Sequence, residues 1–145
     1  MPRIRYAKIA QWFLRLMGWS ICLAFLPIFF PLSWMHVLHR TAGLGEAPSQ
    51  PIFEYLARST SAMYFAHGCV VLLASTDVRR YLPLIRLIAV LNIFAGAVMF
   101  GTDFSASMPL LWTLIEGPPI ITGGLILLWL TRGLKKEMAG ETASD

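Results

Sequence analysis

The sequence predicts an all-α integral membrane protein: a four-transmembrane-helix bundle with the N and C termini in the cytoplasm. Three observations support this prediction. The 145-residue chain is 57% hydrophobic and 14% charged, whereas soluble domains are about 25% charged. Long apolar runs alternate with polar segments, and lysine and arginine gather in every second polar segment, as in cytoplasmic loops. We expect residues 1–145 to form one membrane domain.

The first apolar run, at about residues 11–35, is expected to be a retained first span. The residues before it are basic, like the start of a secretory signal, but no small-x-small cleavage pattern precedes Pro27. Trp19 lies toward one end and Trp34 toward the other, as in aromatic belts. Pro27 and Pro31 are expected to kink the outer half of this helix or end it early.

The second span is expected at about residues 53–75, after a long outer loop at residues 36–52. The loop is rich in glycine, proline and polar residues. The first half of the span is rich in small and hydroxylated residues, which let helices approach closely in lipid. This helix is therefore expected to be buried among the others.

The third and fourth spans are expected at about residues 84–102 and 110–131, before a polar cytoplasmic tail at residues 132–145. The fourth span contains one ionisable residue, Glu116, followed closely by two consecutive prolines. Proline lacks the amide hydrogen that a helix interior needs. We therefore expect the fourth helix either to begin after Glu116 or to break there.

The distribution of positive charge predicts the orientation. Of the 12 lysine and arginine residues, only Arg40 and Arg58 fall in the expected outer segments. This positive-inside pattern places both termini in the cytoplasm of a multi-pass protein in a bacterial-type inner membrane. The net charge of +4 does not indicate nucleic-acid binding, because the basic residues are divided among separate segments. The other ten are Arg3, Arg5, Lys8, Arg15, Arg79, Arg80, Arg86, Arg132, Lys135 and Lys136.

Four charged residues are candidates for ligand binding in one polar pocket open to the outer side: Glu54, Arg58, Asp103 and Glu116. Glu116 is placed ~9 Å below the outer boundary at ~1.5 Å per residue. An ionisable group inside a span is a functional hypothesis by default. Two alternatives stay open: Glu116 ties helices together or accepts backbone hydrogen bonds, and Glu54 and Asp103 are solvated helix ends.

Three further polar residues lie deeper in the predicted spans. His67 is ~20 Å along the second span from Glu54, and Tyr64 shares its side of that helix. The alternative for His67 is a core histidine with satisfied hydrogen bonds. Asn92, in the third span, is expected to make an interhelical hydrogen bond.

The sequence indicates no catalytic residues, no metal and no cofactor, which argues against an enzyme. No HExxH, GxSxG or P-loop motif is present. His36 and His39 form a weak pattern that lacks further ligands, and their role stays open. Cys22 and Cys69 stand alone in apolar runs, so we expect them to pack as small hydrophobic residues.

These motifs resemble a known family. The second helix begins with an acid-x-x-x-arginine pattern, Glu54 to Arg58, after a long first loop. The third helix ends in Gly-x-Asp, Gly101 to Asp103, and Glu116 lies early in the fourth. Over residues 51–130 this resembles the small, mostly uncharacterised four-helix bacterial membrane proteins allied to the DoxX family. The resemblance implies an integral membrane protein and no secure activity.

The leading functional hypothesis is a small membrane protein that binds a small or lipophilic ligand in the polar pocket. An alternative is a non-catalytic accessory subunit of a larger membrane complex, and a less favoured one is a lipid- or quinone-directed membrane enzyme. The expected partners are the lipid bilayer and either other membrane-protein subunits or further copies of this chain.

Overall fold

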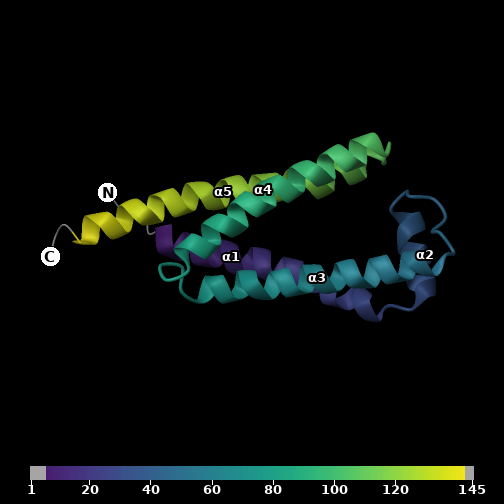
Figure 1. The fold of residues 1–145 in the computed structure, drawn as a ribbon, viewed down its shortest axis with the longest axis horizontal. Coiled ribbons are helices and arrows are strands. Elements are labelled where there is room, and N and C mark those ends of the chain that lie inside the picture. Colours follow the sequence, from purple (N-terminus) through teal and green to yellow (C-terminus); the bar gives the residue numbers. More distant parts are fainter. Residues whose placement is uncertain (1–5, 143–145) are drawn as a thin grey trace.

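The computed structural model describes residues 6–142, and every regular element in this range is a helix (Figure 1). The all-α class is therefore confirmed. In chain order the elements are α1 (Tyr6–Cys22), the 3₁₀ helix η1 (Leu23–Phe29), α2 (Leu32–Thr41), α3 (Pro51–Thr76), α4 (Leu82–Ser105) and α5 (Leu110–Thr142).

The long helices form two antiparallel hairpins. In the first hairpin α1 and η1 pack along α3, and in the second α4 packs along α5. The hairpins meet through α1 and α5, with a smaller contact between α3 and α4. Figure 1 shows that they come together at the end that holds both termini, the terminal end, and diverge toward the end that holds α2, the α2 end.

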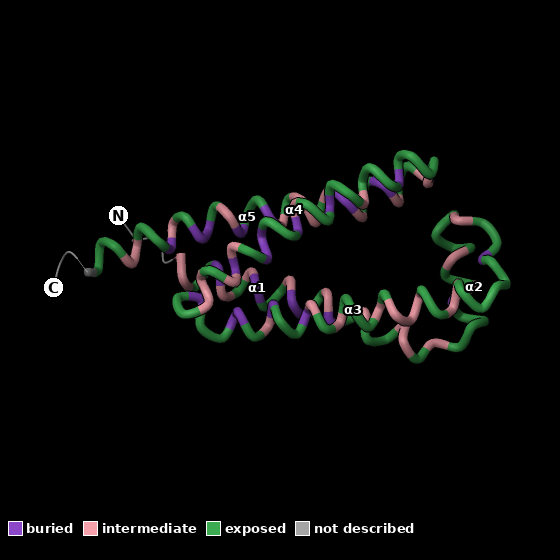
Figure 2. Tube along the Cα trace, in the orientation of Figure 1, coloured by how far each residue is buried: buried purple, intermediate pink, exposed green. Residues whose placement is uncertain are grey.

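The hydrophobic core lies at the terminal end, where all four long helices meet. Figure 2 shows the buried stretches of the first hairpin gathered there. The four helices therefore pack together over only part of their length. At the α2 end they do not form the predicted bundle. The buried core residues are Ala10, Leu14, Val71, Ala74, Val78, Ile85, Ile88, Ala89, Leu127, Leu130 and Leu134.

Within residues 6–142, three segments are long and apolar enough to cross a membrane: Tyr6–Phe29, Leu82–Ser105 and Leu110–Glu141. Their mean hydropathies are 1.6, 2.1 and 1.5. This is what a membrane protein requires, since a bilayer core is ~30 Å thick. At 26 residues α3 is also long enough, but Glu54, Arg58 and its hydroxylated residues make it more polar.

The first predicted span ends early as an α-helix, which is one of the two outcomes expected from its prolines. The α-helix stops at Cys22, a 3₁₀ segment continues to Phe29, and a separate helix, α2, starts at Leu32. Pro27 and Pro31 explain this change, because neither can donate the backbone hydrogen bond that an α-helix needs. The predicted outer loop is consequently half helical.

The predicted burial of the first half of α3 is not observed. The buried residues of this helix, Gly68, Val71, Ala74 and Ser75, all lie in its second half. The reason is the divergence of the hairpins, which leaves the first half of α3 packed on η1 and α2 and away from α4 and α5. Small residues there do not line a four-helix interface.

The fourth predicted span also differs, because α5 passes through both prolines without a break. Pro118 and Pro119 remove the two donors that would reach the carbonyls of Leu114 and Ile115. Continuous packing against α4 supports the helix across this gap. The Thr122 hydroxyl donates a hydrogen bond to the Pro118 carbonyl at 2.8 Å.

Beyond its apolar part, α5 is anchored at the terminal end. The Arg79 guanidinium donates two hydrogen bonds to the Glu141 carboxylate, at 2.7 and 2.9 Å, and Glu137 lies 3.6 Å away. The hydrogen bonds and charge of Glu141, followed by the charge of Glu137, raise the pKa of Arg79. Arginine is protonated at neutral pH in any case, so this link is constant across that range. It explains why α5 continues as a helix to Thr142, into the predicted polar tail.

Glycine permits close approach within each hairpin. A Cβ at Gly68 would lie 2.8 Å from the Cys22 sulfur, and one at Gly117 would lie 2.8 Å from the Gly96 carbonyl oxygen. Gly124 also contacts α4, where an added Cβ would lie 2.6 Å from the Ala89 oxygen. Gly123 faces open space. These contacts are typical of helix packing in lipid.

Candidate functional site

The strongest polar feature is a pair of carboxyl groups in the second hairpin. Asp103 lies in the last turn of α4 and Glu116 in the second turn of α5. The reversal between these helices is tight, and Ser107 adopts a left-handed φ of 54° within it. The close α4–α5 packing then brings the two carboxyl groups near enough to interact. We call Asp103 and Glu116 the acid pair.

The surroundings of the acid pair do not compensate its charge. Asp103 is only 7% exposed, and its Oδ2 atom is buried without a hydrogen-bond partner among the described residues. Glu116 is half-buried, and the Trp112 indole interacts with its carboxyl group. Burying a carboxylate without a partner costs several kcal/mol. The acid pair therefore calls for a proton or a cationic ligand.

Glu54 and Arg58 form a second, separate pair in the first hairpin. Their side chains lie one turn apart on α3 and make an ion pair at 2.8 Å. The same guanidinium donates hydrogen bonds to the carbonyls of Ile28 at 2.6 Å and Phe30 at 3.2 Å. These carbonyls belong to the end of η1, where helix geometry leaves acceptors without partners. Arg58 thus holds η1 against α3.

The four predicted site residues therefore form two pairs on different hairpins. Glu54 lies with Arg58, and Asp103 lies with Glu116. Figure 1 shows the two hairpins apart at this end of the molecule. The structure therefore does not place all four side chains in a single pocket.

Tyr64 and Asn92 connect the two hairpins. The Tyr64 hydroxyl of α3 lies 3.9 Å from the Met99 sulfur of α4, and the charge of Glu116 acts on Tyr64. Asn92 of α4 is buried and donates to the Met17 sulfur of α1 at 3.8 Å. Thioether sulfur is a weak acceptor. Both contacts therefore contribute little to the stability of the hairpin interface, although they link the two hairpins.

The histidines lie away from the acid pair. His67 is half-buried on α3 and is not among the groups that act on Glu116. His36 and His39 pack edge-on against Phe53, with ring centroids 6.1 and 5.6 Å away. His39 Nδ1 also lies 3.1 Å from the Gly45 carbonyl oxygen. No group of three or more potential metal ligands occurs in the part of the chain that the structure describes.

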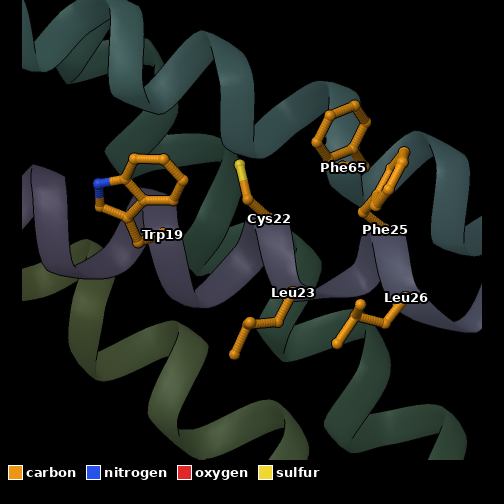
Figure 3. A pocket seen from close by; sticks show the side chains of 6 residues that line it. All are labelled: Trp19, Cys22, Leu23, Phe25, Leu26 and Phe65. Carbon is orange, nitrogen blue, oxygen red and sulfur yellow. The ribbon is translucent and has the colours of Figure 1, made fainter.

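An apolar pocket of about 280 Å³ lies between the first helix segment and α3 (Figure 3). The pocket was not predicted from the sequence, because apolar residues within an apolar run do not indicate a cavity. Only the prolines that follow them indicate that the helix geometry changes there. We call it the aromatic pocket. Its lining residues are Trp19, Cys22, Leu23, Phe25, Leu26 and Phe65.

Comparison of this chain with protein-family models, curated proteins and solved structures finds no match. The class of protein therefore follows from the fold of residues 6–142 alone: all-helical, with three segments long and apolar enough to cross a membrane and with a buried Asp103 beside a half-buried Glu116. The resemblance to DoxX-type proteins stays a prediction.

Proposed function

We propose that this chain crosses the membrane four times, with both termini in the cytoplasm, and that α3 is the additional span. Two observations support this. α3 is 26 residues long and packs lengthwise on α1, which is itself apolar enough to cross. The α3–α4 connection, with Arg79 and Arg80, lies at the same end as both termini in Figure 1. This arrangement supports a common cytoplasmic side for the basic segments.

Within this topology, we infer that the protein binds a small lipophilic cation at the acid pair. The observation that carries this inference is the buried Asp103 carboxylate with an unpartnered oxygen beside Glu116. A protonated amine supplies both the charge and the N–H donors that this oxygen lacks. Trp112, and Tyr64 from the other hairpin, add aromatic surface of the kind that attracts cations. A ligand would enter where the hairpins diverge.

The test is thermal unfolding of the purified protein in detergent with octylamine, using octanol as the uncharged control. Octylamine is protonated at pH 7, so we expect it to raise the Tm of the native protein while octanol does not. Asp103→Asn and Glu116→Gln should each abolish the increase. Glu54→Gln is the matched control, because Glu54 is an acid at the α2 end that is already paired with Arg58. It should keep the response.

Two results would overturn the inference. One is an equal rise in Tm for octylamine and octanol, which would indicate nonspecific partitioning. The other is an undiminished amine response in Asp103→Asn and Glu116→Gln, which would place the binding elsewhere.

A further inference from the structure

Cys22 and Cys69 meet where α1 crosses α3. The crossing is close, since a Cβ at Gly68 would lie only 3.0 Å from the Cys22 backbone nitrogen and 2.8 Å from its sulfur. Figure 3 shows the Cys22 sulfur directed toward α3. Cys69 is the next residue after Gly68, and the two thiols interact. The proximity of the two cysteines was not predicted, because they lie far apart in the sequence.

This geometry suits an interhelical disulfide. Disulfides join cysteines whose Cα atoms are about 4.4–6.8 Å apart, and Cys69 directly follows the glycine whose backbone contacts Cys22. Both cysteines are free thiols in the structure. Cys22 lies in one of the three apolar segments, and Cys69 lies in α3, for which we propose a membrane crossing, so both are kept away from the water-soluble thiols that reduce exposed disulfides in the cytoplasm.

The aromatic pocket gives a lipid-soluble reagent access to Cys22. Cys22 lines the pocket, and its sulfur is the only thiol there; the aromatic walls are Trp19, Phe25 and Phe65. The Phe25 and Phe65 ring centroids are 5.0 Å apart. Drug-sized ligands need about 300–1,000 Å³, so about 280 Å³ suits a single ring.

We propose that Cys22 and Cys69 are a redox-active pair that reduces a lipid-soluble quinone whose ring enters the aromatic pocket. Both S–H bonds break and one S–S bond forms between the residues. The two protons and two electrons pass to the quinone, which leaves as the hydroquinone. The resulting disulfide ties the point where α1 becomes η1 to the middle of α3. This proposal is independent of the acid pair.

The test uses the reduced full-length protein in lipid nanodiscs without oxygen, treated with a short-chain ubiquinone analogue. Alkylation after denaturation counts the free thiols, intact mass detects the loss of two hydrogen atoms, and absorbance follows the quinone. We expect one intramolecular disulfide and one hydroquinone per chain. Cys22→Ala and Cys69→Ala are matched controls of similar volume, and each should form neither product.

The proposal fails if both thiols are still alkylated after quinone treatment. It also fails if copper–phenanthroline forms the disulfide but the quinone does not, because the pocket would then admit no electron acceptor. Hydroquinone formation that persists in both alanine variants would likewise overturn it. Phe65→Trp, which enlarges a pocket wall, should slow the reaction with quinone and leave the reaction with copper–phenanthroline unchanged.

Discussion

Asp103 and Glu54 are both carboxylates near the α2 end, yet their surroundings give them different roles. Glu54 has a cationic partner 2.8 Å away and is partly exposed. Asp103 is buried beside a second carboxyl group and keeps an unpartnered oxygen. A charge that is paired locally serves the fold, whereas one that is buried and uncompensated is a candidate for ligand or proton binding.

Replacing Asp103 with asparagine should stabilise the ligand-free protein. Asparagine removes a desolvated negative charge and supplies an N–H₂ donor to Glu116. We expect the free energy of unfolding to rise by about 1 kcal/mol, the range of a recovered buried hydrogen bond. Denaturant unfolding in detergent measures it. A loss of stability would mean that the Asp103 carboxylate already has a favourable partner in the protein.

Replacing Arg58 with alanine should destabilise the first hairpin. The carbonyls of Ile28 and Phe30 lose their donor, and each unsatisfied buried acceptor costs about 1–3 kcal/mol. Arg58→Lys is the control, since it keeps the charge and one donor and should lose less stability. The same unfolding measurement compares them. Equal stability of the native and alanine proteins would show that η1 does not depend on this contact.

At the scale of elements, the effect of the prolines was predictable in the first helix but not in α5. Pro27 and Pro31 end the first α-helix at Cys22, earlier than hydropathy alone indicates. Pro118 and Pro119 do not interrupt α5, because packing against α4 outweighs two lost hydrogen bonds. The sequence shows which backbone N–H donors the prolines remove. It does not show that packing against a neighbouring helix will compensate for their loss.

The candidate site was predictable only within each hairpin. The i,i+4 spacing of Glu54 and Arg58 indicates their ion pair, and the short turn after α4 brings Asp103 toward Glu116. Combining all four residues into one pocket assumed that the charged side chains of the three helices all point toward a common centre. The divergence of the hairpins depends on long-range packing of the core at the terminal end, which helical periodicity does not encode.

Two glycines in α5 provide a matched test of helix packing. Gly117→Ala should place a methyl group against the Gly96 oxygen and Phe100, at an overpacking cost of about 1–3 kcal/mol. Gly123→Ala meets nothing within 4 Å and should be neutral or stabilise by up to about 1 kcal/mol through helix propensity. Unfolding in detergent separates the two. Similar effects at both positions would contradict the close α4–α5 approach.

At the scale of the whole molecule, one architecture links these features. The four long helices share a core at the terminal end, and the hairpins diverge toward the α2 end (Figure 1). The acid pair belongs to the second hairpin, and the Tyr64 hydroxyl of the first hairpin contacts Met99 of the second. Placing the α2 end toward the outer face requires α3 to cross the bilayer, so the topology of α3 is the central claim.

Cysteine accessibility in intact cells tests that claim directly. In a background with Cys22→Ala and Cys69→Ala, single cysteines are placed at Ser49, Arg80 and Ser105, which flank α3 and end α4. A membrane-impermeant maleimide should label positions 49 and 105 from outside, and position 80 only after permeabilisation. Labelling of positions 49 and 80 from the same side would show that α3 does not cross, and would contradict the four-span account.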